Sequence, residues 1–233
     1  MRTEIIKKHT KEVCVNITAG VADSLRLQSE KLSTVRVYDG GFIGIAGKKG
    51  AASTEALTDE AKNNLSRGIP YPDKPEAPLT LDVNAYKHII DDKDFLPYVS
   101  AAAKRIAEEN PGFIINGKAY LNETETVYDN GAGRKLSYKG NATSMAVIYK
   151  DKKSANIMDG SIAVEDNKII GEDFFKDVKT RLDAFLTPVD HFKEDKIPVI
   201  MSGSYFSSAL QHFVADIYCN GASLFNGKLG EKI

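Results

Sequence analysis

Short β-prone runs dominate the first part of the chain. Residues 12–19, 24–28 and 33–47 each combine β-branched or aromatic residues with polar neighbours, a pattern typical of strands. The last run is interrupted by Asp39-Gly40. Because the second position of a tight hairpin turn requires a positive φ, which glycine adopts readily, this pair predicts a β-hairpin.

Three later segments have helical features. Thr58 is a suitable N-cap for a short helix that Gly68 would end. Residues 93–109 have apolar side chains at helical spacing before an Asn-Pro-Gly stop signal, and residues 171–186 carry one apolar stripe. Between the first two helices, four prolines within residues 70–78 predict a stiff extended connector.

Residues 113–170 alternate β-prone runs with turn signals. Because turns at such short intervals force neighbouring strands to run antiparallel, this region predicts a β-meander. The sequence therefore indicates an α+β fold in which antiparallel β-meander sheets pack against a few amphipathic helices. The turn signals are Asn116-Gly117, Asn130-Gly131, Lys139-Gly140-Asn141, Lys150-Asp151-Lys152 and Asp159-Gly160.

Composition excludes several classes of function. The 233 residues include 31 Lys and Arg against 32 Asp and Glu, and no basic run is longer than two residues. Because binding to a phosphate backbone needs a concentrated positive stripe, we expect no nucleic-acid partner. The N-terminal segment has no apolar block of the length that a signal peptide or membrane span requires, and Cys14 and Cys219 lie far apart. These features predict a cytoplasmic protein with free thiols that does not bind membranes.

A helix expected within residues 202–221 has two different sides. At about 100° per residue, apolar side chains gather on one side and polar ones on the other. Zinc is conceivable on the polar side because a histidine, an aspartate and a cysteine share it, but side chains stacked over two turns of one helix seldom converge to within about 2.0–2.3 Å of one point. Geometry therefore favours a plain polar surface over a metal site. The polar stripe consists of Tyr205, Ser208, His212, Asp216 and Cys219.

Several longer stretches resemble a known family. They are STVRVYDGGFIGIAGKKG, the β-meander, DVKTRLDAFLTPV, IPVIMSGSYFSSALQHFV and NGASLFNGKLGEKI. Together they resemble the TldD/PmbA family, whose members were once called modulators of DNA gyrase and are now regarded as peptidases. The resemblance implies a cytoplasmic peptide-processing protease that works on unfolded or small peptides. It also implies a homodimer, or a heterodimer of a TldD-like and a PmbA-like subunit.

The zinc motif of the family's catalytic subunits is altered in this chain. That motif is His-Glu, three residues, then His, on the helix after the apolar strand. Gln211, His212 and Asp216 stand at the three positions. Glutamine is a poor zinc ligand, and a single aspartate cannot hold the ion. The resemblance is thus closer to the PmbA-like, non-catalytic subunits, and we expect neither a bound metal nor a catalytic residue.

The resemblance also organises the chain into regions. Residues 1–70 are expected to form a strand-rich α+β subdomain, 71–112 a connector and helix, and 113–195 the β-meander plus a helix. Residues 196–233 would begin the family's C-terminal domain, most of which lies beyond the end of this sequence.

These observations predict a metal-free subunit that binds a partner subunit and an extended peptide, which would add to an exposed edge of the β-meander through main-chain hydrogen bonds. The polar stripe of residues 205–219 would face the partner or the peptide channel. Two alternatives remain open at this point. One is an active zinc-dependent peptidase with an atypical site at His212, Asp216 and Cys219, and the other is a degenerate remnant without activity.

Overall fold

The computed structural model describes residues 1–71, 73, 75–188, 206–208 and 210–211. The chain divides into two compact units, Met1–Thr187 and Pro188–Ile233. The first unit contains all the strands and helices described below. In the second unit, residues 206–208 and 210–211 are helical, as the sequence predicts for this segment.

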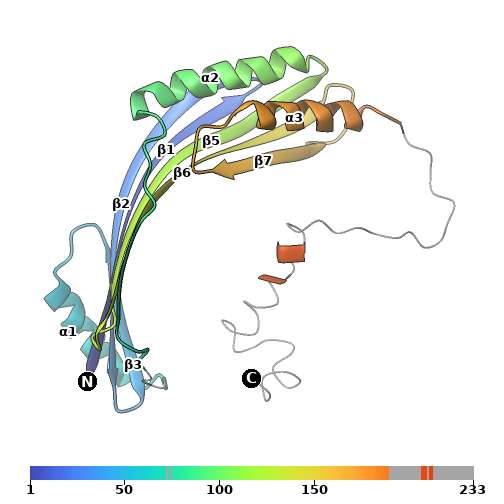
Figure 1. Cartoon of the computed structure of the whole chain (residues 1–233). Coiled ribbons are helices and arrows are strands. Elements are labelled where there is room, and N and C mark those ends of the chain that lie inside the picture. Colours follow the sequence, from blue (N-terminus) through green and yellow to red (C-terminus); the bar gives the residue numbers. More distant parts are fainter. Residues whose placement is uncertain (72, 74, 189–205, 209, 212–233) are drawn as a thin grey trace, which may run out of the picture. The chain divides into compact units, whose positions relative to one another are not determined.

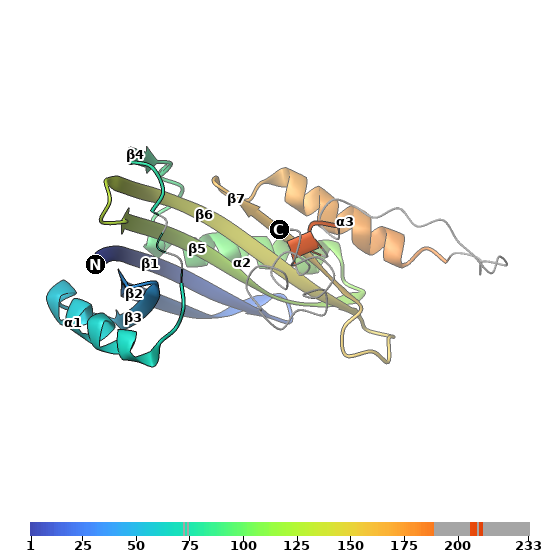
Figure 2. The same ribbon diagram turned by 90° about the horizontal axis from the view of Figure 1, so that it is seen from below.

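The first unit is built on one seven-stranded sheet with the order β3-β2-β1-β5-β6-β4, and β7 also pairs with β6. All strand pairs are antiparallel except β4 with β6, which is parallel. The antiparallel pairing of β5, β6 and β7 confirms the predicted α+β fold with an antiparallel meander. β4 and β7 lie beside opposite ends of β6 (Figure 2). The strands are β1 (Arg2–Thr18), β2 (Val21–Asp39), β3 (Phe42–Lys49), β4 (Leu79–Asn84), β5 (Phe113–Asp129), β6 (Arg134–Asp151) and β7 (Gly160–Asp166).

The helices are α1 (Thr54–Asn64), the short 3-10 helix η1 (Leu65–Arg67), α2 (Asp92–Glu109) and α3 (Glu172–Phe185). α2 and α3 confirm the helices predicted from periodicity. α1 and α2 lie against the convex side of the curved sheet (Figure 1). None of the helices described is both long and apolar enough to cross a membrane.

The first helix begins five residues earlier than the sequence predicts. Its N-cap is Ser53, whose Oγ accepts a hydrogen bond from the Ala56 N–H at 3.3 Å. Thr58 lies inside the helix instead, where its hydroxyl donates to the Thr54 carbonyl at 2.7 Å. The prediction of Thr58 as the cap is therefore wrong, while Gly68 does end η1, in a left-handed conformation with φ 65°.

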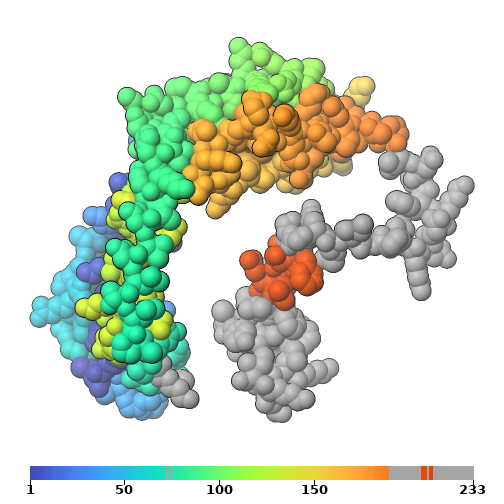
Figure 3. All heavy atoms as spheres, viewed as in Figure 1, coloured from blue at the N-terminus to red at the C-terminus, as the bar shows by residue number. Residues whose placement is uncertain are grey.

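Two hydrophobic clusters lie on the same face of the sheet. The smaller one joins α1 to β2 and β3 through Val35, Val37, Ala46, Leu57 and Ala61. The larger one joins α2 and α3 to the other end of the sheet, and Figure 3 shows these two helices together in green and orange. Its largest fully buried side chains are Phe95, Ile106, Ile115, Met145 and Leu182.

Some of the turn signals mark real turns. The β2–β3 hairpin turns at Gly40 and Gly41, with φ values of 57° and 85°, directly after Asp39. Asn130-Gly131 likewise lies between β5 and β6, and Gly131 has a φ of 67°. These positions confirm the turns that the sequence predicts.

Two other turn signals lie inside strands, so those turn predictions are wrong. Gly117 pairs within β5, and a side chain there would collide with the backbone of Ala146 on β6. Gly140 pairs within β6 and is covered by the side chain of Tyr138. In both places glycine makes room for a neighbouring group and does not reverse the chain.

The central strand β1 unites the regions that flank the proline-rich connector. β1 pairs with β2 on one side and with β5 on the other, so residues before and after the connector form one sheet. The connector contributes β4 and then follows the β6 edge to α2; the Ala85 N–H donates to the Lys139 carbonyl at 2.7 Å. Figure 3 shows this segment running along the sheet.

A buried carboxylate holds one end of the sheet together. The Glu4 side chain is 6% exposed and accepts hydrogen bonds from Arg36 Nη1 at 2.9 Å and from Tyr128 at 3.1 Å. Tyr38 donates to the same carboxylate at 3.4 Å, and Arg2 lies 3.6 Å away. Burial raises the pKa of Tyr38 and Tyr128, and the Glu4 charge adds to the shift. Both hydroxyls therefore stay protonated and donate.

Replacing this carboxylate should destabilise the fold. Glu4→Ala leaves Arg36, Tyr38 and Tyr128 without their shared acceptor, and we expect the free energy of unfolding to fall by about 2–4 kcal/mol. Glu12→Ala is a matched control on the same strand and sheet face, where the partner Arg26 is 61% exposed. The control should lose at most about 1 kcal/mol. Equal losses in urea unfolding would contradict the role given to Glu4.

The buried hydroxyl of Tyr98 should make the fold less stable in alkaline solution. Its hydroxyl, on α2, donates to the Ile170 carbonyl just before α3. Burial raises the pKa of Tyr98 to about 12. Because the unfolded phenol titrates near a pKa of about 10, this stability is fully present below that pH and is lost as pH rises towards 12. Urea unfolding at pH 8 and pH 11 should show a smaller drop for Tyr98→Phe than for the wild type, whereas identical drops would exclude this linkage.

Candidate functional site

The polar stripe predicted from the sequence lies mostly outside the described residues. Tyr205, His212, Asp216 and Cys219 are not among them. Ser208 and Gln211 are described, and both are helical and exposed. The proposed roles of all six positions remain predictions. Within the described ranges, no three His, Cys, Asp or Glu side chains are grouped so that they could hold a metal ion.

The outer edge of β2, which lies outside the predicted meander, is a candidate binding surface; the sequence analysis expected the free edge in the meander instead. β3 pairs only with residues 32–39 of β2, because β3 is 8 residues long and β2 is 19. Among the residues described, no strand pairs with the outer side of residues 21–30. This segment is largely exposed, with Val21 and Leu27 each 63% accessible.

The backbone groups that point out of this edge can be identified. The Gly50 N–H donates to the Lys31 carbonyl at 2.8 Å, so Lys31 directs its backbone groups away from β1. In an antiparallel ladder, alternate residues direct their N–H and C=O groups to the same side. Leu25, Leu27 and Ser29 therefore present unpaired donors and acceptors to the outside, while Arg26 and Gln28 pair with β1.

The other long strands have covered edges. The outer edge of β6 is occupied by β4 and β7, and Asn141 between them exchanges hydrogen bonds with the Lys87 backbone. β3 is covered in part by the chain after η1, where the Ile43 N–H donates to Ile69 and the Tyr71 N–H donates to Gly41. β2 thus offers the longest uncovered strand edge within the described part of the chain.

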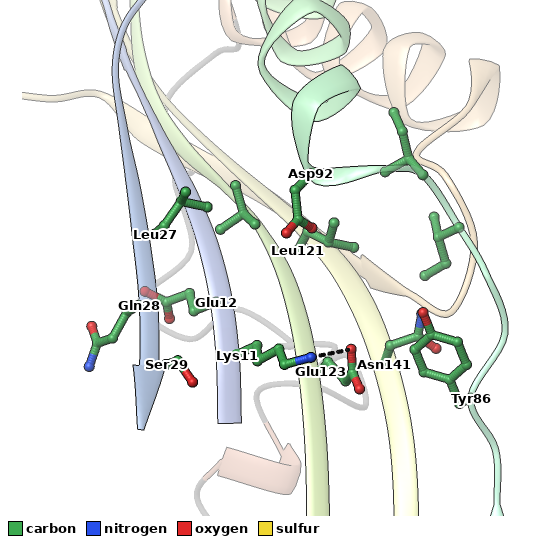
Figure 4. Close-up of a pocket in the computed structure, with 13 residues that line it drawn as sticks. Lys11, Glu12, Leu27, Gln28, Ser29, Tyr86, Asp92, Leu121, Glu123 and Asn141 are labelled. Atoms are coloured by element: carbon green, nitrogen blue, oxygen red, sulfur yellow. Dashed lines mark ion pairs between the residues drawn. The ribbon is translucent and has the colours of Figure 1, made fainter. Parts of the chain in front are cut away.

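A groove of about 360 Å³ opens on the sheet surface next to this edge. Figure 4 shows Leu27, Gln28 and Ser29 of β2 on one side of it and Tyr86 and Asn141 on the other. The start of α2 closes one end. The apolar part of the lining consists of Val13, Leu27, Ile89, Ile90 and Leu121.

Alternating charges lie across the strands beside the groove. Lys11 Nζ is 3.9 Å from Glu123, which is also 3.4 Å from Lys139 (Figure 4 shows the first pair). Lys139 bonds Glu125 at 2.8 Å, and this hydrogen bond lowers the pKa of Glu125 and raises that of Lys139. The charges compensate one another, so the groove offers hydrogen-bonding groups without a strong preference for charge.

A serine and a histidine also meet near the groove. His9 Nε2 lies 3.0 Å from Ser29 Oγ, the distance at which the histidine base contacts the serine nucleophile in a catalytic triad. The carboxylate opposite His9 in the strand register is Glu125. That carboxylate is held by Lys139, and no ion pair joins it to His9. The described geometry thus supports binding by this surface better than nucleophilic catalysis.

Comparison with solved structures places this fold among known proteins. No family profile and no curated protein matches the sequence. TldE from Thermococcus kodakarensis is 11% identical, with a TM-score of 0.59 over 78% of this chain and 43% of that one. A "putative modulator of DNA gyrase" from Bacteroides thetaiotaomicron is 14% identical, with a TM-score of 0.58 over 78% of this chain and 45% of that one.

The chain therefore spans less than half the length of these two proteins. At such low identity the similarity concerns the fold. The similarity confirms the resemblance at the level of the fold: this chain has the fold of the TldD/PmbA proteins.

Proposed function

We propose that this chain is a metal-free, peptide-binding subunit of a peptide-processing system in the cytoplasm. One observation carries the proposal: residues 21–30 of β2 form an exposed strand edge whose backbone groups have no strand partner within the described residues. An extended peptide can add to such an edge through main-chain hydrogen bonds.

Strand addition here would be broadly tolerant of sequence. The outward residues Leu25, Leu27 and Ser29 supply backbone donors and acceptors that any peptide except one rich in proline can pair with. Side chains of the peptide that point to the groove meet an apolar floor and compensated charges. This combination suits a protein that handles many unfolded or small peptides.

Catalysis would come from a second subunit. This chain would pair with a copy of itself or with a TldD/PmbA-like subunit that carries an intact zinc motif. The stripe of Tyr205, Ser208, His212, Asp216 and Cys219 would face that partner or the peptide channel. Gln211, His212 and Asp216 do not make a suitable donor set for the family's zinc, so no chemical step is assigned to this chain.

Blocking one outward N–H should block peptide binding. Leu27→Pro removes a donor that faces the free edge and leaves the ladder with β1 intact, a substitution that edge strands tolerate. We expect the affinity for a fluorescent ten-residue peptide of neutral sequence, measured by fluorescence polarisation, to fall about tenfold or more.

The matched control is Leu27→Thr, which shortens the same side chain but keeps the backbone N–H. Its affinity should stay within about threefold of the wild type, since the main chain carries the interaction. Urea unfolding establishes that both variants are folded. Equal affinity of the proline variant and the wild type, or an equal loss in both variants, would refute binding at this edge.

A further inference from the structure

A second pocket lies where the free edge of β2 ends. It has a volume of about 370 Å³ and lies between the sheet and the loop that leads into α1. Lys31 belongs to it and is also the residue whose carbonyl receives the Gly50 N–H, so β3 begins to cover β2 at this point. The rest of the lining includes Lys7, Lys8, His9, Ala51 and Val127.

The charges of this pocket are poorly compensated. In the strand register Lys7 is opposite Ser33 and His9 is opposite Lys31, so Lys7 and Lys31 are diagonal neighbours on one sheet face. No carboxylate of the described residues lies within ion-pair distance of Lys7, Lys8 or Lys31. The acid in the lining, Glu125, is already paired with Lys139 at 2.8 Å.

Lys7 and Lys31 differ from the neighbouring lysines, which have acidic partners. Lys49 bonds Glu30 at 2.8 Å, and Lys11 and Lys139 share the glutamates of β5. Like charges that neighbour each other across strands are destabilising unless an opposite charge joins them. An anion in the pocket would relieve the repulsion between Lys7 and Lys31 and would accept charge-assisted hydrogen bonds.

The position of the pocket indicates which anion it binds. A peptide added to residues 21–30 cannot continue past Lys31, because Gly50 occupies the next backbone position on that edge. One end of the peptide must therefore stop beside the lysines. If the peptide runs parallel to β2, that end is its C-terminus, which carries a carboxylate.

We infer that this lysine pocket binds the α-carboxylate of an extended peptide lying parallel to β2. This inference rests on the proposed function and specifies its substrate class as short peptides with a free C-terminus. Internal segments of longer chains lack the carboxylate and would bind less tightly. The apolar side of the pocket, with Ala51, Ala52 and Val127, would contact the last side chain of the peptide.

The test compares two forms of one neutral ten-residue peptide labelled at its N-terminus, with a free C-terminal carboxylate or a C-terminal amide. In fluorescence polarisation, the wild type should bind the carboxylate form about tenfold more tightly, as one charge-assisted contact allows. Lys7→Met/Lys31→Met should bring this ratio to about one without changing the affinity for the amide form.

The matched control is Lys135→Met/Lys168→Met, which removes the same charge from exposed lysines paired with Asp129 and Asp166. This variant should keep the tenfold ratio. If the wild type binds both forms equally and Leu27→Pro abolishes both, the carboxylate pocket is refuted while the proposed function stands. If the wild type binds neither form, both are refuted. A ratio that falls equally in the control means that general charge, and not this pocket, is responsible.

Discussion

The backbone ladder between β1 and β5 is the interaction on which the rest of the structure depends. Each strand is 17 residues long, and their pairing joins two antiparallel units that would otherwise be separate sheets. The ladder fixes the register across all seven strands and so decides which side chains share a face. It gives α2 and α3 one continuous apolar surface and leaves the middle of that face polar.

Differences in strand length then create the candidate site. β2 pairs with β1 over nearly its whole length, but β3 is too short to cover it, so ten residues of β2 keep an unpaired edge. Natural proteins usually protect long exposed edges because they invite other strands. This edge carries Leu25 and Leu27, adjoins a groove and ends at uncompensated lysines. A ligand that binds there explains why this edge is not protected.

Much of the fold could be predicted from the sequence, because local patterns and tertiary packing agree. The stripe of Phe174, Val178 and Leu182 became the buried side of α3, and Asp39 precedes the hairpin turn. The predictions failed at positions whose conformation is set by residues that are distant in sequence. Gly117 and Gly140 lie in sequences typical of turns, yet groups packed against them occupy the space of a side chain and the strands continue through both positions. Residues 29–32 of β2, which separate two predicted strands, include no β-branched or aromatic side chain, yet all four pair with β1.

The candidate site was harder to predict for a related reason. A free strand edge has no residue signature, since it depends on which strands are absent beside it. The sequence directed attention to the stripe at Tyr205–Cys219, most of which lies outside the described residues. Lys7 and Lys31 are 24 positions apart, and only the β1–β2 register brings them together.

Residue-resolved amide hydrogen exchange, with and without a saturating neutral peptide, tests directly whether a peptide strand adds to the free edge of β2. We predict that the peptide slows exchange at Leu25, Leu27 and Ser29, whose N–H groups point outwards. Exchange at Arg26 and Gln28 should be unchanged because their N–H groups already bond to β1. A peptide that binds while exchange at these three outward amides stays the same would contradict strand addition at β2.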